Sequence, residues 1–177
     1  MSQDALFDAV AIDRLLRELA AELDHRGVKG RMFVVGGAAM ALAYGRDRVT
    51  RDIDAVFEPK EEIYRIARMI AARHGLAADW LKDGVKGFMH GADPDATVVF
   101  DEPGLSLEVA SPRYLFTMKA LAARVDRDAR DLQRLYQICG FTSVADALDH
   151  LERTAPAAWL TAKSRFLVQE LLEDKGT

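Results

Sequence analysis

The chain has 177 residues, of which 50% are hydrophobic and 29% are charged, and its formal net charge is -4. This composition excludes a disordered, fibrous or repeat protein and fits one globular domain with a small helical unit appended to it. The acidic balance argues against a protein that coats nucleic acid through bulk charge, so any polyanion would have to be bound locally.

No stretch predicts a signal peptide or a membrane span. The N-terminus lacks a positively charged leader, and the longest apolar run, residues 33–45, is too short for a bilayer and contains Gly36 and Gly37. The single cysteine, Cys139, cannot form an internal disulfide, which favours a reducing compartment. We therefore expect a cytoplasmic protein with no membrane association.

The first part of the chain alternates between helical and strand patterns. Apolar residues at helical spacing predict an amphipathic helix over 5–25. A β-branched and aromatic run over 32–35 ends at a glycine pair, which predicts a buried strand that turns into a helix over 38–44. A second strand is expected over 52–57, and proline and glycine at its two ends delimit a helix over 59–74.

The middle of the chain predicts a hairpin, and the rest predicts helices. Residues 78–89 resemble a loop with a short helical turn, and strands over 97–100 and 105–109 flank the turn Asp-Glu-Pro-Gly. Ser111 and Pro112 are typical of a helix start. The expected helices after that point cover 112–123, 127–139, 143–153 and 157–173.

This order predicts an α+β fold, in which a small mixed β-sheet with flanking helices is followed by a C-terminal helical tail. We expect a catalytic core over residues 1–110 and a helical region over 111–177 packed on it as one compact unit.

Asp52 and Asp54 are the strongest candidates for chemistry. In a strand, residues i and i+2 point to the same face, so the two carboxylates would project together while Ile53 points into the opposite layer. Paired carboxylates repel each other unless a cation or proton lies between them, and oxygen ligands of this kind suit Mg²⁺ or Mn²⁺. Taken alone, an Asp-x-Asp is more often a solvated strand edge or a cap.

Gly36 and Gly37 form the second element of the pattern. Glycine at a strand-to-helix junction lets the backbone approach a ligand, and the following helix directs its amides toward a phosphate. A glycine pair alone is more often a turn or packing feature. The order of glycine turn and aspartate pair within one strand-helix-strand unit favours nucleotide chemistry.

Residues 34–37 (VVGG) and 50–54 (TRDID) resemble the signature of the DNA polymerase β-like nucleotidyltransferase superfamily. Within it, the chain is similar to the minimal bacterial nucleotidyltransferases of the DUF6036 type, which are related to the AbiEii-like toxins of toxin-antitoxin systems. The resemblance implies transfer of a nucleotidyl group with two metal ions held by Asp52 and Asp54. It also implies that the Gly36 and Gly37 backbone cradles the phosphates, although Gly37 lacks the serine hydroxyl found in many members.

Further nucleotide contacts are expected around this motif. Thr50 and Arg51 lie within it, and Arg46, Arg48 and Arg51 form a basic cluster suited to a triphosphate or an RNA end, or simply a solvated loop. Lys86 lies in a segment that also matches the DUF6036 type, and it would contact the nucleotide. The aromatic residues Trp80 and Phe88 of that segment are more often core residues than a base pocket.

A third metal ligand is usual in the superfamily, and the positional candidate is Glu108, with Asp101 as the lesser alternative. A lone strand glutamate is more often simply solvent-exposed.

The resemblance also implies catalytic roles for Lys119 and Asp131, since AbiEii-like enzymes use a helical lysine followed by an aspartate on the next helix. Lys119 is an ammonium in an otherwise apolar helix face and needs a nearby anion, which could be a nucleotide phosphate or Asp131. Asp128 shares a helix face with Asp131 and could orient Lys119 or Arg124. The alternative is a structural salt-bridge network.

These features predict a Mg²⁺-dependent enzyme that transfers an NMP from an NTP to a hydroxyl acceptor, in a toxin-antitoxin or defence pair. The acceptor would be an RNA 3′ end, such as that of tRNA, or a protein, and the partner would be a cognate antitoxin or toxin. The alternatives are a non-catalytic nucleotide-binding or antitoxin-like module of the same fold, and a nucleotidyltransferase that modifies a small molecule such as an antibiotic.

Overall fold

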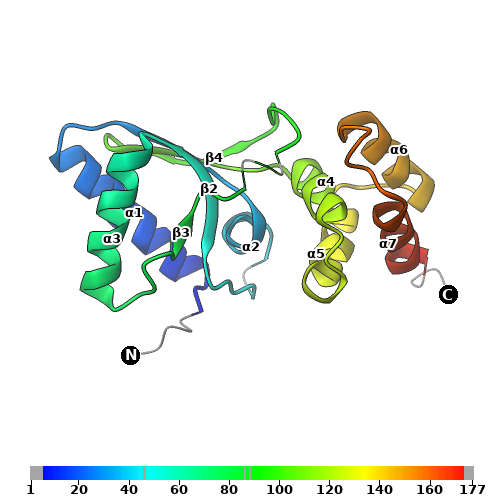
Figure 1. Ribbon diagram of the computed structural model, residues 1–177, viewed down its shortest axis with the longest axis horizontal. Coiled ribbons are helices and arrows are strands. Elements are labelled where there is room, and N and C mark those ends of the chain that lie inside the picture. Colours follow the sequence, from blue (N-terminus) through cyan, green and yellow to red (C-terminus); the bar gives the residue numbers. More distant parts are fainter. Residues whose placement is uncertain (1–5, 46, 86, 88, 174–177) are drawn as a thin grey trace. The chain divides into compact units, whose positions relative to one another are not determined.

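The computed structural model describes residues 6–45, 47–85, 87 and 89–173 (Figure 1). The chain divides into two compact units. The first, the sheet unit, comprises Met1–Gly87 and Asp95–Ala110. The second, the helical unit, comprises Phe88–Pro94 and Ser111–Thr177.

The sheet unit contains a five-stranded mixed sheet with the strand order β3-β2-β1-β5-β4. Strand β1 pairs with β2 in antiparallel and with β5 in parallel orientation, β3 is parallel to β2, and β4 forms the predicted antiparallel hairpin with β5. This arrangement confirms the expected α+β class. The strands are β1 (Gly30–Val34), β2 (Ile53–Glu58), β3 (Leu81–Lys82), β4 (Thr97–Asp101) and β5 (Leu105–Val109).

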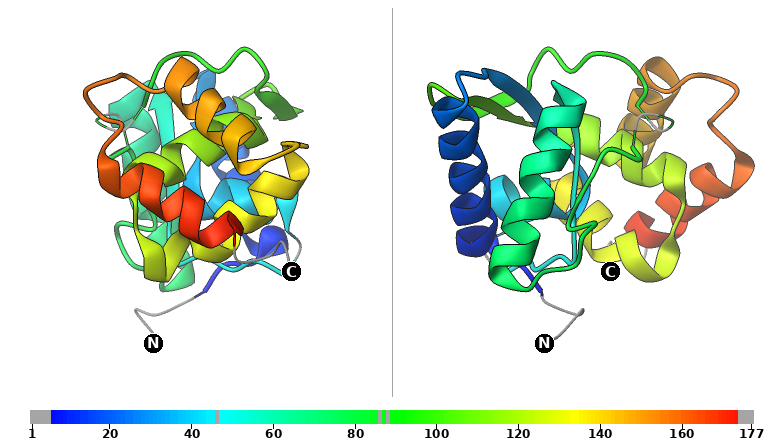
Figure 2. Two further views of the ribbon diagram at one scale, coloured as in Figure 1. Left: turned by 90° about the vertical axis from the view of Figure 1, so that its right-hand side faces the viewer. Right: turned by 60° about the vertical axis from the view of Figure 1, so that its left-hand side comes forward.

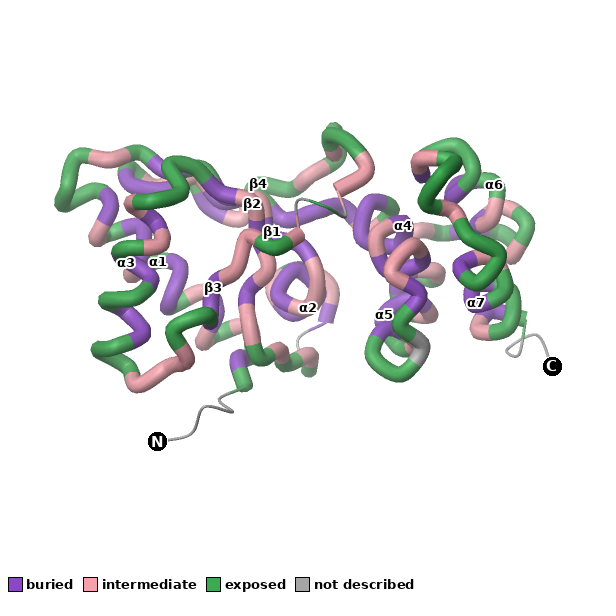
Figure 3. The backbone as a smooth tube through the Cα atoms, in the orientation of Figure 1, coloured by how far each residue is buried: buried purple, intermediate pink, exposed green. Residues whose placement is uncertain are grey.

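One face of this sheet is buried beneath helices α1 (Ala9–His25) and α3 (Lys60–His74) (Figure 2). Burial alternates along β1, β2 and β5, so every second side chain is withdrawn from water (Figure 3). The alternation matches apolar residues on one face and mixed polar residues on the other, and it fixes which face carries charge. The buried side chains of the central strands are Met32, Val34, Ile53, Ala55, Phe57, Leu105, Leu107 and Val109.

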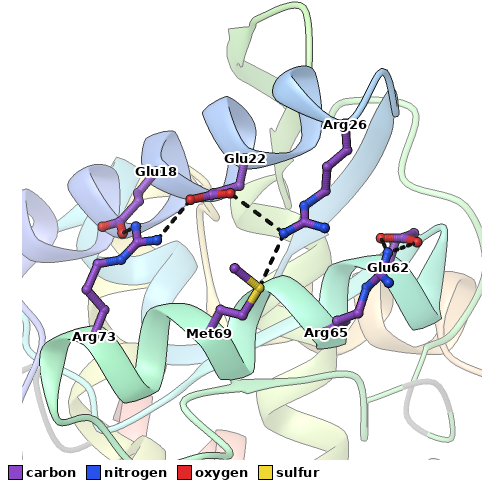
Figure 4. Close-up of polar contacts among 7 residues, drawn as sticks. All are labelled: Glu18, Glu22, Arg26, Glu62, Arg65, Met69 and Arg73. Carbon is purple, nitrogen blue, oxygen red and sulfur yellow. Dashed lines mark hydrogen bonds and ion pairs between the residues drawn. The ribbon is translucent and has the colours of Figure 1, made fainter.

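Ion pairs link α1 to α3 along their solvent-exposed edge (Figure 4). Arg73 donates hydrogen bonds to Glu18 and Glu22, and His74 Nε2 lies 2.7 Å from Glu18 Oε2. Burial alone would raise the pKa of the Glu18 carboxyl, but hydrogen bonds from His74 and Arg73 outweigh it and lower that pKa. These pairs contribute little to stability, because exposed ion pairs are worth about 0–1 kcal/mol.

The helical unit contains α4 (Pro112–Ala122), α5 (Val125–Ile138), α6 (Val144–Thr154) and α7 (Ala162–Glu173). Ser111 caps α4 by accepting a hydrogen bond from the Tyr114 amide, and Ser143 caps α6 in the same way. Asp93 accepts hydrogen bonds from both the amide and the hydroxyl of Ser111, which ties the segment before it to this unit.

Several boundaries differ from the sequence-based expectation by a few residues, and the two largest differences have clear physical reasons. Within the predicted loop 78–89, Leu81 and Lys82 form the edge strand β3, which is too short to show an alternating pattern. The last helix begins at Ala162 rather than at residue 157, because Pro156–Trp159 forms a turn and Thr161 Oγ1 accepts a hydrogen bond from the Ser164 amide.

Gly104 provides a test of how the hairpin packs on α1. A Cβ atom at this position would lie 2.0 Å from the Ala20 carbonyl oxygen and 2.6 Å from the Asp24 amide nitrogen, so the helix backbone itself would have to move. We expect Gly104→Ala to lower the free energy of unfolding by about 1–3 kcal/mol in urea titrations, the usual cost of overpacking. The matched control is Gly84→Ala, where no atom lies within 4 Å, and equal effects of the two variants would contradict this packing.

Candidate active site

The glycine turn packs directly against strand β2. Gly36 has a left-handed backbone (φ 65°) at the start of α2 (Gly36–Ala39), two residues earlier than predicted, and the helix continues as the π-helical segment η1 (Met40–Tyr44). A Cβ atom on Gly36 would lie 3.2 Å from Asp54 Oδ2, and one on Gly37 would lie 2.9 Å from Thr50 Oγ1. A side chain at either position would therefore crowd one of these two neighbours, and at Gly36 the positive φ disfavours it further.

The aspartate pair lies at the start of strand β2, which begins one residue later than predicted. Asp54 is the second residue of β2, and its carbonyl oxygen accepts a hydrogen bond from the Val35 amide at 2.9 Å. Asp52 immediately precedes the strand, and both aspartates are half-buried while Ile53 between them is fully buried. Two carboxylates thus flank a residue that anchors them to the core.

Lys82 is the residue that sequence reasoning missed. Its Nζ lies 2.8 Å from Asp52 Oδ2 and 3.3 Å from Asp79 Oδ2. The hydrogen bond to Asp52 raises the pKa of the Lys82 ammonium. Parallel pairing of β2 and β3 sets Lys82 beside Asp54, so the sheet register carries this cation to the aspartate pair. A two-residue strand gives no sequence signal for such a placement.

The donor set fits a divalent cation that is only partly held by protein. Within the described ranges, no group of three or more His, Cys, Asp or Glu side chains could hold a metal ion. Mg²⁺ is commonly bound through one or two carboxylates, with water and substrate phosphate oxygens completing its octahedron. Asp52 and Asp54 supply two carboxylates beside a glycine turn, and they are therefore the residues that would hold the ion.

Glu108 is exposed on the same sheet face but is offset from the aspartates. It pairs with Phe33, which in turn pairs with Val56, so it lies two strands and two residues away from Asp54. With strands about 4.8 Å apart and a rise of about 3.3 Å per residue, the two Cα atoms are separated by about 12 Å. Its role as a third ligand stays a prediction.

A pocket of about 290 Å³ lies on this part of the face. Its lining consists of Arg31, Met32, Phe33, Val56, Phe57, Glu58, Ser106 and Glu108. Asp101, the alternative third ligand, instead pairs with Lys29 at 2.9 Å, and this hydrogen bond lowers the pKa of Asp101.

Lys119 and Asp131 meet within the helical unit, together with Asp128. Lys119 Nζ lies 2.8 Å from Asp128 Oδ1 and 2.9 Å from Asp131 Oδ2, and all three side chains are at most 8% exposed. Arg124 Nε approaches the other Asp128 oxygen at 3.3 Å. Lys119 thus has two carboxylate partners, Asp128 and Asp131, which lie about one turn apart on α5.

The other predicted nucleotide contacts have mixed outcomes. Thr50 donates a hydrogen bond from its hydroxyl to the Asp52 carbonyl oxygen at 3.0 Å, and Arg51 is exposed. Lys86, Arg46 and Phe88 lie outside the described residues. Trp80 is fully buried, which confirms the expectation of a core residue, and its Nε1 donates a hydrogen bond to the Ala67 carbonyl oxygen.

Residues 17–90 match the family model described as nucleotidyl transferase AbiEii toxin, type IV toxin-antitoxin system. The match contains the glycine turn, the aspartate pair and Lys82. This segment is therefore similar to AbiEii nucleotidyl transferases. No curated protein and no solved structure matches the chain. None of the described helices is long and apolar enough to cross a membrane.

The fit between the AbiEii-like glycine turn and β2 can be tested through Gly37 and Thr50. We expect Gly37→Ala to be destabilising, because its methyl group would collide with the Thr50 hydroxyl. The cost should be smaller in a Thr50→Ala background, with a coupling of about 1 kcal/mol in a double-mutant cycle measured by urea unfolding. Strictly additive effects would show that the two residues do not touch.

The buried Lys119 cluster makes a second prediction. Lys119→Met keeps the aliphatic stem but leaves two buried carboxylates without their cation, and we expect it to lower the free energy of unfolding by about 3–5 kcal/mol. Adding Asp128→Asn and Asp131→Asn should restore part of this loss, since the uncompensated charges disappear. Lys163→Met on the exposed surface of α7 is the control. Equal, small effects of the two lysine variants would contradict a buried ion-pair cluster.

Proposed function

We propose that this AbiEii-like protein transfers an NMP from an NTP to a hydroxyl acceptor with Mg²⁺, and that it acts as the toxin of a type IV toxin-antitoxin pair. The observation that carries the proposal is the close approach of Gly36 to Asp54 inside the segment that matches the family. One metal ion can contact a carboxylate and a bound phosphate only if the carboxylate lies beside the phosphate-binding turn. Here the Asp54 carboxylate lies so close to the turn that a Cβ atom on Gly36 would be 3.2 Å from Asp54 Oδ2.

Asp52 and Asp54 would hold the metal in this proposal. When bound, Mg²⁺ would neutralise phosphate charge and lower the pKa of an acceptor hydroxyl. Mn²⁺ has the same preference for oxygen ligands. The protein supplies the fixed part of the site. Ile53 is buried in the core, and this fixes the backbone of its neighbours Asp52 and Asp54 at the start of β2.

The reaction itself is an in-line substitution. A bond forms between the acceptor oxygen and the α-phosphorus of the NTP, the bond from that phosphorus to the bridging oxygen breaks, and pyrophosphate leaves. The acceptor gives up its proton to solvent or to a carboxylate. Little covalent chemistry is required of the protein, so positioning and charge stabilisation account for the catalysis.

The remaining predicted residues have supporting roles in the proposal. The Gly36 and Gly37 amides would contact the β- and γ-phosphates, while Arg51 and Lys86 would also bind the nucleotide. The Thr50 hydroxyl lies where a side chain on residue 37 would otherwise project, so it is suited to supply a phosphate contact that Gly37 lacks.

Lys119 and Asp131 would act catalytically within the helical unit, as their likeness to AbiEii-like enzymes implies. A polar role for Lys119 is supported by its burial beside two carboxylates, which an apolar core position would not need. Glu108 would be an additional metal ligand in the proposal.

The acceptor would be an RNA 3′ end, such as that of tRNA, or a protein, and a cognate antitoxin would be the partner. The gene of that antitoxin would be sought beside the gene of this chain.

The proposal is tested by incubating the purified protein with each radiolabelled NTP, Mg²⁺ and either total tRNA or the adjacent gene product. We expect label to enter one acceptor, and we expect Asp52→Asn or Asp54→Asn to reduce incorporation at least about 10³-fold, as for loss of a group that stabilises the transition state. Lys29→Met serves as the control for charge removal, because Lys29 precedes β1 at the end opposite to Asp54 and pairs with Asp101 instead.

Incorporation that is equal in the wild-type protein and in both aspartate variants would overturn the proposal. Label in a small molecule but in neither macromolecule would keep the chemistry and replace the acceptor.

A further inference from the structure

We propose that Lys82 is an internal cation for Asp52 that makes metal binding depend on nucleotide binding. Without substrate, the Lys82 ammonium group pairs with the Asp52 carboxylate and weakens metal binding there. With an NTP present, the triphosphate offers Lys82 a new anionic partner and frees Asp52 for the metal. This inference rests on the proposed function, because it assumes that Asp52 and Asp54 are the metal-binding pair.

The position of Lys82 is fixed by its backbone neighbours. The Trp80 carbonyl oxygen accepts a hydrogen bond from the Ile53 amide at 2.7 Å, and the buried Trp80 ring is anchored to α3. On the other side, Asp83 accepts a hydrogen bond from the Tyr64 hydroxyl at 2.7 Å. The residues on both sides of β3 are therefore attached to α3. This attachment holds the Lys82 backbone at the edge of β2, beside Asp54.

The side chain of Lys82, in contrast, is able to move. It is 38% exposed, and its ammonium group is linked to the protein through the carboxylates of Asp52 and Asp79. Lysine presents a compact charge on a flexible four-carbon stem, so it can leave one anion for another without moving the strand.

The contact with Asp52 opposes a second cation at the same oxygen. Lys82 Nζ lies 2.8 Å from Asp52 Oδ2, which is hydrogen-bonding distance, so a metal ion bound to that oxygen would face an adjacent positive charge. Metal alone must displace the ammonium into water. A metal and a triphosphate that arrive together add net negative charge to the site, so the displaced ammonium gains phosphate oxygens as favourable partners. Because coupling is reciprocal, the nucleotide would strengthen metal binding by the same factor as the metal strengthens nucleotide binding.

The test measures binding rather than turnover. Mn²⁺ is titrated into the full chain and followed by electron paramagnetic resonance, and Mg²⁺-saturated inorganic triphosphate is titrated separately by calorimetry. We expect Lys82→Met to bind Mn²⁺ alone about tenfold more tightly than the wild-type protein, and to bind magnesium triphosphate about tenfold more weakly. Lys82→Arg keeps the charge and should stay near the wild-type values, and Lys29→Met should change neither affinity.

The outcomes separate three possibilities. Tighter Mn²⁺ binding with weaker triphosphate binding supports the inference. Unchanged or weaker Mn²⁺ binding by Lys82→Met overturns it, whether Lys82 is then only a phosphate ligand or only a structural residue. Circular dichroism and thermal melting without metal verify that the variant is folded, as expected for a partly exposed side chain.

A parallel titration of an Asp52→Asn, Asp54→Asn variant distinguishes failure of the proposed function. If this variant binds Mn²⁺ as the wild-type protein does, the aspartates are not the metal site, and the proposed function fails together with the inference. If only the aspartate variant loses Mn²⁺ and Lys82→Met behaves as wild type, the inference alone fails.

Discussion

The close contact between the glycine turn and strand β2 is the constraint on which the site depends. A Cβ atom at position 36 or 37 would crowd the side chain of Asp54 or Thr50. The same approach is held by the hydrogen bond from the Val35 amide to the Asp54 carbonyl oxygen. A side chain at position 36 would push against the Asp54 carboxylate that the proposed chemistry needs. The backbone conformation of the turn and the position of this carboxylate therefore depend on each other.

Charge is handled in two different ways in the two units. In the sheet unit, Lys82 pairs with Asp52 at a partly exposed site, where an ammonium can be exchanged for another cation. In the helical unit, Lys119 pairs with Asp128 and Asp131 at a site almost closed to water. Breaking the first pair costs little because solvent replaces it, whereas breaking the second leaves buried charge. The exposed cluster is thus suited to exchange and the buried one to fixed geometry.

Much of the secondary structure could be predicted because it follows from local patterns. Strand β5 and the helix α3 with its Gly75 cap are as expected, since alternation and terminal glycine depend only on neighbouring residues. Strand β3 could not be predicted, because two residues have no period and only hydrogen bonds to β2 make them a strand. Helix α7 also begins later than predicted, because a turn over Pro156–Trp159 precedes it and Thr161 caps its first turn.

The sequence by itself determined the α+β class, the family resemblance and the alternation that exposes Asp52 and Asp54 around buried Ile53. Only the tertiary structure decided which groups these carboxylates meet. Lys82 is 30 residues from Asp52 along the chain, and Lys119 meets both Asp128 and Asp131, between which the sequence could not choose. Such contacts depend on strand register and helix packing between distant segments, which residue periodicity does not encode.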